Sequence, residues 1–274
     1  MGGVNNLEVF ERHDKAIQSI YGSRLMIQIL LSVEDEGTPL STLRDITGST
    51  SQALIPKIRK LESLSLVESR GPGYGPTILG KIIAQKIGDF SLTMGTLTTH
   101  LAFWKDHDIS TLPWPLLERL GDLLNSEIVS DTGTDIMHVY YRFLQLLREA
   151  KQIAGISTMM NPGLAEMLSQ RVIEGVPVDL LVNPGTLEQL QREPYISLSV
   201  SILKFDNFHL WVTDRPIGYG LTVTESAISI GFYRRDMPIY DISTDLFSRD
   251  PAAISWGRAL FDKLREEAVL FSGF

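Results

Sequence analysis

Residues 51–61, SQALIPKIRKL, decide how the first third of the chain is interpreted. Three apolar residues recur there at helical spacing: Leu54, Ile58 and Leu61. Three basic residues lie mostly between them: Lys57, Arg59 and Lys60. Pro56 conflicts with a regular helix, because proline lacks an N–H group and its ring collides with the preceding turn. The segment therefore predicts a basic helix that either begins at about Leu54 or has a kinked or 3₁₀ first turn.

The elements expected around this segment predict a winged helix-turn-helix. Two helices precede it, residues 23–33 with Ser23 as cap and residues 39–47 ended by Gly48. A hairpin follows it, with a strand at 67–70, a tight turn GPGYGP at 71–76 and a return strand at 77–80. Helix, short helix, turn, basic helix and hairpin is the order of that fold.

The expected DNA contacts follow from this order. The outward positions of the basic helix are Ser51, Gln52, Ala53, Pro56, Lys57 and Lys60. Gln52 suits a base edge, with adenine the usual partner of glutamine, whereas the two lysines suit phosphates. At the wing, Arg70 and Tyr74 are expected to meet the DNA backbone or the minor groove. Pro56 is interpreted as a shape feature of this surface, or else as a tolerated kink.

The charge distribution favours this interpretation. The chain has 274 residues and a net charge of −8. Residues 1–90 contain ten basic and ten acidic residues, so the whole excess of acid lies in residues 91–274. Between residues 49 and 86, six basic residues stand against two acidic ones, a local net charge of +4. A local basic excess matters more for a phosphate backbone than the total charge.

Composition and termini predict a cytoplasmic protein. The chain has no cysteine, which excludes disulfides and thiolate chemistry. The first 20 residues do not show the pattern of a signal peptide, and no apolar run approaches the ~20 residues of a membrane span. With 43% hydrophobic residues the chain can bury a core.

The remaining chain predicts a helical segment and an α/β domain. Residues 91–130 are expected to form a helical linker that contributes to a dimer interface, between a reader domain at 1–90 and a domain at 131–274. From residue 135, helices alternate with short apolar strands, which indicates an α/β sandwich with a partly parallel sheet. Residues 197–204, SLSVSILK, are expected to be one of its strands.

Ligands of such sheets bind at the carboxyl ends of the strands. The polar residues expected there are Ser157, Thr158, Asn183, Thr213, Asp214 and Arg215. They are candidates for holding a small molecule. Residues of these types also occur at ordinary junctions between a strand and a loop, and that alternative is slightly favoured.

No catalytic or metal-binding set is visible. The five histidines show no paired metal-ligand spacing. The stretch HLWVTD at 209–214 is weakly similar to the His-x-Lys-x4-Asp strand of phospholipase D-type enzymes. Trp211 stands where that chemistry needs lysine, and Asp214 comes two residues too early. No enzyme activity and no cofactor are therefore expected.

Three further stretches carry a family resemblance: FWKDHDIS at 103–110, EGVPVDLLVN at 174–183 and SWGRALFDKLREEA at 255–268. With the winged helix before them, they resemble the archaeal methanogenesis regulatory proteins from about residue 15 onward. The resemblance implies an ArsR-like winged helix joined to a ligand-sensing domain of phospholipase D-like type without the catalytic pair. It also implies transcriptional regulation, a homodimer and a small-molecule effector.

We therefore predict a DNA-binding transcriptional regulator with an α+β fold, whose partner is double-stranded DNA and which does not bind a membrane. Two alternatives remain open: an adaptor whose winged helix docks another protein, and an enzyme housed in the second domain.

Overall fold

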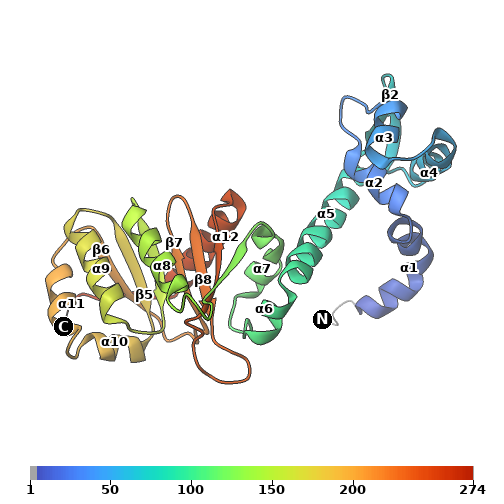
Figure 1. Cartoon of the computed structure of the whole chain (residues 1–274). Helices are drawn as coiled ribbons and strands as arrows, with labels where there is room; N and C mark the ends of the chain where they lie inside the picture. The colour runs from blue at the N-terminus through green and yellow to red at the C-terminus, as the bar shows by residue number, and fades with distance from the viewer. Residues whose placement is uncertain (1–4, 274) are drawn as a thin grey trace. The chain divides into compact units, whose positions relative to one another are not determined.

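The computed structural model describes residues 5–273 and has a mixed α+β fold (Figure 1). The chain divides into two compact units, Met1–Ser91 and Leu92–Phe274. Within the described residues, none of the helices is both long enough and apolar enough to cross a membrane.

The first unit is mainly helical. Its elements are α1 Asn6–Tyr21, α2 Arg24–Ser32, α3 Leu40–Thr47, α4 Ser51–Ser63, β1 Val67–Arg70, β2 Gly73–Pro76 and α5 Ile78–Thr99, the last of which runs past the boundary. The three apolar residues of α4 that recur at helical spacing are buried in one core with residues of α2 and α3: Leu54, Ile58 and Leu61. Gly48 ends α3 at a φ of 64°, a backbone conformation that glycine adopts without strain. The expected order of helices and hairpin is present.

Helix α4 begins before Leu54, the start given by one of the two predictions for this helix. It is α-helical from Ser51, so a start at about Leu54 is wrong. The Thr50 hydroxyl accepts a hydrogen bond from the Ala53 N–H at 3.4 Å and caps the first turn. Pro56 is the sixth residue of the helix and has no N–H to donate to the Gln52 carbonyl. Pro56 is exposed, so its ring lies outside the core.

The cap of α4 gives a first prediction. Thr50→Ala should lower the free energy of unfolding by about 1 kcal/mol, because the Ala53 N–H loses its side-chain acceptor. Urea denaturation followed by circular dichroism measures the change. Ser49→Ala is the matched control, since the Ser49 hydroxyl makes only a 3.5 Å contact with the Thr47 carbonyl. An equal loss in both variants would contradict the capping role.

The hairpin is shorter than expected. The turn contains only Gly71 and Pro72, and residues 73–76 are themselves the return strand, paired antiparallel with 67–70. The expectation of a return strand at residues 77–80 is therefore wrong. Thr77 instead caps α5, which begins at Ile78, since its hydroxyl accepts the Gly80 N–H at 3.0 Å. Glycine is needed at position 73 because a Cβ there would collide with the Thr38 carbonyl.

The second unit is built on one sheet of eight strands in the order β10-β6-β5-β4-β7-β8-β9-β3. Strands β4, β5 and β6 are parallel and the other pairs are antiparallel, so the sheet is partly parallel as expected. The strands are β3 Glu127–Ser130, β4 Ile153–Ser157, β5 Val178–Val182, β6 Phe208–Val212, β7 Tyr219–Val223, β8 Ile228–Phe232, β9 Thr244–Ser248 and β10 Val269–Leu270. The helices are α6 Leu101–Asp106, α7 Trp114–Leu117, the 3₁₀ helix η1 Leu120–Leu123, α8 His138–Glu149, α9 Pro162–Ile173, α10 Pro184–Leu190, α11 Ile196–Ile202 and α12 Pro251–Arg265.

One expected strand is a helix. Residues 196–202 form α11, so a strand at 197–204 is wrong. Serine alternates with apolar residues there, which fits a strand, but tertiary packing favours the periodicity of a helix. Ser199 and Ile202 are the buried residues of this segment, and their spacing of three positions places them on one face of a helix.

Residues 92–130 pack within the second unit. Phe103, Trp104 and Leu116 belong to the same buried cluster as Trp256 and Phe261 of α12, on one face of the sheet. The other face carries a separate cluster, formed with residues of α8, α9 and α11. Dimerisation through residues 91–130 stays a prediction.

Candidate functional site

The outward face of α4 presents the expected polar residues. Gln52, Ala53 and Lys60 are exposed, and Ser51 and Lys57 are half-buried. Arg59 donates a hydrogen bond to Glu62 at 2.8 Å, which neutralises its charge locally. In the part of the chain that the structure describes, Lys57 and Lys60 have no carboxylate within 4.0 Å. Two lysines of this face therefore remain without a neutralising partner.

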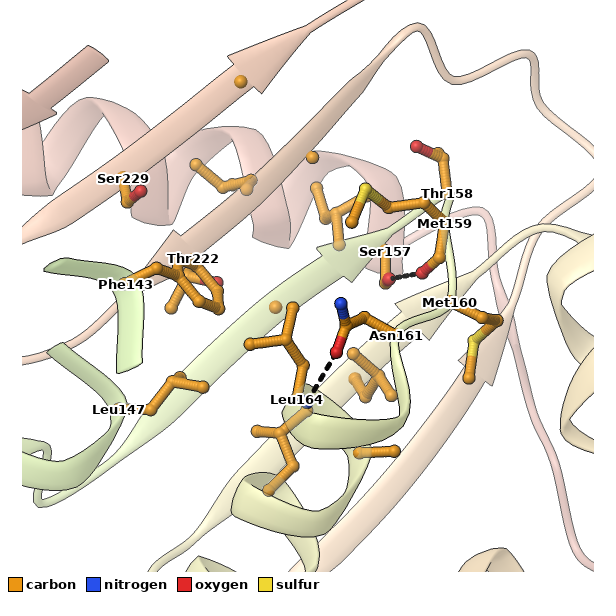
Figure 2. Close-up of a pocket in the computed structure, with 18 of the residues that line it drawn as sticks. Phe143, Leu147, Ser157, Thr158, Met159, Met160, Asn161, Leu164, Thr222 and Ser229 are labelled. Atoms are coloured by element: carbon orange, nitrogen blue, oxygen red, sulfur yellow. Dashed lines mark hydrogen bonds between the residues drawn. The ribbon is translucent and has the colours of Figure 1, made fainter. Parts of the chain in front are cut away.

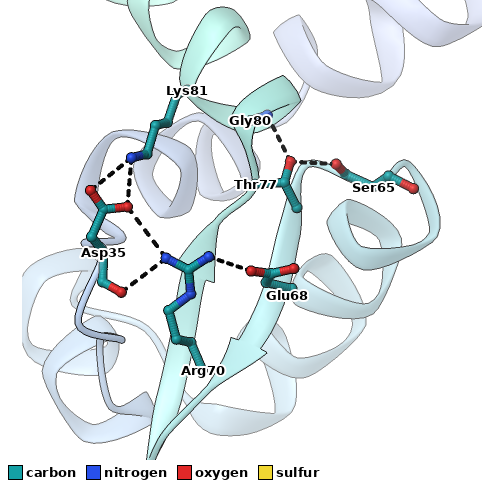
Figure 3. A network of polar contacts seen from close by, with 7 residues as sticks. All are labelled: Asp35, Ser65, Glu68, Arg70, Thr77, Gly80 and Lys81. Atoms are coloured by element: carbon teal, nitrogen blue, oxygen red, sulfur yellow. Dashed lines mark hydrogen bonds and ion pairs between the residues drawn. The ribbon is translucent and has the colours of Figure 1, made fainter.

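The two predicted wing residues, Arg70 and Tyr74, contact other residues of the first unit. Figure 3 shows the Arg70 guanidinium between Asp35 and Glu68: it donates to the Asp35 carbonyl at 3.0 Å, to the Asp35 carboxylate at 3.4 Å and to Glu68. Lys81 donates to the same Asp35 carboxylate at 2.7 Å, and this hydrogen bond is the main reason why the pKa of Asp35 is lowered. Tyr74 is half-buried against the core of the first unit.

The second unit contains a cavity of about 270 Å³ between the sheet and the helices α8, α9 and α11 (Figure 2). Its walls are mostly apolar, with Phe143 and Leu147 from α8 and Leu164 from α9. The volume is close to the lower end of small-ligand pockets, which span roughly 300–1,000 Å³.

Three glycines of the sheet line the cavity. Gly155 of β4, Gly220 of β7 and Gly231 of β8 all line it, one from each of three adjacent strands. Glycine is unfavourable inside strands and often marks a close approach to another group. A Cβ at Gly220 would lie 2.7 Å from the Tyr240 hydroxyl, and one at Gly231 would collide with the same hydroxyl. Tyr240 therefore packs against Gly220 and Gly231, while a Cβ at Gly155 would come closest to the tip of the Leu180 side chain, at 3.3 Å. We call these three residues the glycine floor.

Polar groups gather at the β8–β9 end of the cavity. The Ser229 hydroxyl donates to the carboxyl group of Asp245, and the Tyr240 ring lies beside them. Burial raises the pKa of Asp245 to about 7, against the opposing effect of the Ser229 hydrogen bond, and the charge of Asp241 adds to the rise. Burial, together with the charges of Asp245, Tyr233 and Asp241, also raises the pKa of Tyr240. Asp245 is therefore about half protonated at neutral pH.

A second buried pair lies next to this end. His107 and Asp241 are both buried, with 3.2 Å between the imidazole Nε2 and the carboxylate. Burial opposes ionisation of Asp241, but hydrogen bonds from Ser243 and His107 outweigh it and lower its pKa. Asp108 accepts the Ser110 N–H at 2.9 Å.

Two of the six predicted ligand residues reach the cavity. Ser157 and Thr158 line it, and the Ser157 hydroxyl donates to the Met159 carbonyl at 2.7 Å. The other four lie outside its lining, and three of them have other partners. Asn183 caps α10, Thr213 accepts the Arg215 N–H at 3.3 Å, Arg215 pairs with Glu267 at 3.0 Å, and Asp214 is exposed.

Sequence reasoning missed Ser229, Tyr240, Asp245 and the glycine floor. The available signal was one glycine in each of the apolar stretches IAGIS, YGLTV and ISIGF. This pattern predicts a shared site only if the three strands are known to be neighbours in the sheet, because the three glycines then lie on one face.

The weak phospholipase D-like stretch occupies β6 and does not assemble a catalytic pair. His209 and Trp211 both approach Asp179, each at 3.2 Å. Among the described residues, no group of three or more His, Asp or Glu side chains is arranged to hold a metal ion.

The two units define a class of protein: a helix-turn-helix module with a basic helix, followed by an α/β domain with an apolar cavity. Residues 14–94 match the model of the N-terminal domain of methanogenesis regulatory protein FilR1, and residues 136–267 match the model of its middle domain. The chain belongs to the family of archaeal methanogenesis regulatory proteins.

One relative is FilR1 of Methanothrix harundinacea (strain 6Ac), which is 29% identical over 251 residues. The match covers 90% of this chain and 56% of the relative, so the chain spans about half the length of the curated relative that it matches.

Solved structures of similar arrangement are more distant. TrmBL2, described as an archaeal chromatin protein with a novel mode of DNA binding, matches 94% of this chain and 99% of its own, at 15% identity and a TM-score of 0.42. Nuc from Salmonella typhimurium, a phospholipase D family member, matches 53% of this chain and 98% of its own, at 10% identity and a TM-score of 0.42.

Proposed function

We propose that this chain is a DNA-binding transcriptional regulator of the cytoplasm. The observation that carries the proposal is the outward face of α4, where Lys57 and Lys60 stand without acidic partners beside exposed Gln52 and Ala53. A second helix of a helix-turn-helix lies in the major groove and uses its N-terminal residues to contact bases. Membership of a family of regulatory proteins supports the same function.

The roles within this face follow from chemistry. Gln52 offers an amide that matches the donor and acceptor of adenine, while Ser51 and Ala53 allow close approach of the helix. Lys57 and Lys60 bind phosphates and set affinity rather than sequence preference. The proposal also includes Arg70 and Tyr74 at the wing, although Arg70 must exchange its contacts with Asp35 and Glu68 for a phosphate.

We also propose that the protein acts as a homodimer. Helix α5 carries five exposed apolar residues: Ile78, Leu79, Ile82, Phe90 and Leu92. An exposed apolar surface often marks a contact with another protein. A symmetric contact between two copies would cover it and would place two winged helices on half-sites of DNA.

The cavity of the second unit is the proposed effector site. It is mostly apolar and carries a few polar groups at one end, which is the usual character of small-molecule sites. An effector that binds one arrangement of the dimer better than the other would change the spacing of the two reader helices, and so the affinity for DNA.

The test is a salt titration of binding to a fluorescent duplex from the upstream region of the protein's own gene. Replacing both Lys57 and Lys60 with alanine should weaken binding about 10- to 100-fold at low salt and reduce the slope of log affinity against log salt by about one to two. The physical reason is that each lysine on a phosphate releases a counterion.

The matched control removes two positive charges from the second unit, Lys151→Ala with Lys204→Ala, since both lysines are exposed. This control should leave the slope unchanged. Equal effects of the two double variants would show that net charge, not the α4 face, governs binding.

A further inference from the structure

Polarity changes steadily across the cavity. On the β5 and β6 side the sheet contributes Leu180, Val182, Phe208 and Leu210. On the β7, β8 and β9 side it contributes Thr222, Ser229 and Asp245. Gly155 of β4 lies between these two sides, and Gly220 and Gly231 belong to β7 and β8, where the Tyr240 hydroxyl packs against them. A molecule seated on the floor therefore has apolar contacts at one end and hydrogen-bonding groups at the other.

The charges of the lining disfavour ionised molecules. No lysine, arginine or histidine occurs among the residues that line the cavity in the described chain, so an anion would lack a counterion and would meet carboxylates. Two of its three carboxyl groups are already engaged, Asp131 by the Val139 N–H at 2.9 Å and Asp241 by His107. Asp245 pairs with the Ser229 hydroxyl and is held partly protonated by burial, since its pKa is raised to about 7. An ammonium group would therefore have to bury its charge beside a carboxyl that is only partly ionised and already accepts the Ser229 hydroxyl.

Two hydroxyl groups of the lining have no partner. The Thr158 Oγ1 and Ser169 Oγ atoms are buried and form no hydrogen bond in the structure, and Ser169 as a whole is only 4% exposed. Buried polar atoms are rarely left unsatisfied in folded proteins. A bound molecule with oxygen atoms would give these hydroxyls an acceptor.

We propose that the cavity binds an uncharged, mainly apolar small molecule that carries a hydroxyl or carbonyl group, with its apolar part over Gly155 of the glycine floor and against Phe143 and Leu164. Its oxygen lies at the Ser229–Asp245 end, and a second oxygen can meet Thr158. The inference rests on the proposed effector site and adds the class of ligand that this site accepts.

Three probes of equal chain length test the charge preference: 1-octanol, octanoate and octylamine, each titrated into the full chain at neutral pH. Methyl NMR of ¹³C-methionine gives the location, because Met159 and Met160 line the cavity while Met26 lies in the core of the first unit. We expect 1-octanol to shift the Met159 and Met160 signals and to bind at least about tenfold more tightly than either charged probe, because the charged groups lose hydration without compensation.

The alternatives are distinguishable. Equal or tighter binding of octanoate or octylamine would overturn the assignment of an uncharged ligand. Two results would overturn the cavity as the binding site. One is a shift of the Met26 signal without shifts of the Met159 and Met160 signals. The other is that none of the three probes gives saturable binding. DNA binding is measured on the same samples: normal DNA affinity with no probe binding refutes this inference and leaves the DNA-binding function standing.

A variant gives a second line of evidence. Gly155→Val adds a side chain at the floor, and its Cβ would lie 3.3 Å from the tip of the flexible Leu180 side chain. It should reduce 1-octanol affinity at least about tenfold, as expected for lost cavity volume. Gly133→Val is the control, because no atom lies within 4 Å of a Cβ at that position and it does not line the cavity. Unchanged 1-octanol affinity in a folded Gly155→Val variant would contradict the proposal. If that variant does not fold, the Met159 and Met160 shifts of the wild type decide whether the probe binds in the cavity.

Discussion

Replacing Trp256 with alanine is expected to lower the free energy of unfolding by about 3–5 kcal/mol. Trp256 lies on α12, is fully buried, and packs in the cluster that joins this helix to the sheet and to residues 103–123. Its indole N–H donates to the Leu116 carbonyl at 2.9 Å. The substitution therefore leaves a cavity and removes one hydrogen bond to the Leu116 carbonyl, which still accepts the Arg119 N–H at 3.2 Å. Urea denaturation followed by circular dichroism measures the loss.

Trp256→Phe is the matched variant, because it keeps much of the aromatic volume but removes the hydrogen bond. We expect it to cost about 1–3 kcal/mol, less than alanine. A loss below 1 kcal/mol for Trp256→Ala would contradict the position of α12 in this core.

Asp245→Asn is expected to change how stability depends on pH. In the folded chain the pKa of Asp245 is raised from 3.8 to about 7, so the native state keeps a proton that the unfolded state loses from about pH 4 upward. Asp245 thus makes the wild type less stable as pH rises from about 4 to 7, with no further change above that range. Asparagine cannot ionise, so the variant should gain about 2–4 kcal/mol relative to the wild type above pH 7 and little at pH 4. Urea denaturation at pH 5 and pH 8 measures the difference.

Ser229→Ala tests the titration of the Asp245 carboxyl by removing its hydrogen-bond donor. The Ser229 hydrogen bond lowers the pKa of Asp245, so its removal should raise that pKa further and extend the falling part of the stability profile above pH 7. A difference between Asp245→Asn and the wild type that is the same at pH 5 and pH 8 would show that Asp245 does not titrate in this range.

Local patterns were sufficient where one face of an element is buried. The spacing of Leu54, Ile58 and Leu61 predicted the core side of α4, because a helix places residues three and four apart on one face. Capping residues located helix ends, as Ser23 did for α2. The same methods failed for residues 197–204, where alternation also fits a helix, and for the hairpin, where glycines at 73 and 75 are strand residues pressed against neighbouring backbone.

The candidate cavity was only partly predictable for a related reason. Ser157 and Thr158 were found because the carboxyl end of a parallel strand is a common binding position. Asn183, Thr213 and Arg215 also lie at strand ends, but they cap a helix, close a turn and form an ion pair. Which strand ends border a cavity depends on the helices packed above them.

The sequence by itself determined the family, the basic helix with its buried stripe, and the change from a mainly helical unit to an α/β domain, because these depend on spacing within single segments. The tertiary structure alone decided that Gly155, Gly220 and Gly231 form one floor, that Asp245 meets Ser229, and that Arg70 is held by Asp35 and Glu68. Each of these depends on which strands and loops are neighbours in space, and the order of strands in a sheet is not written in the periodicity of any one of them.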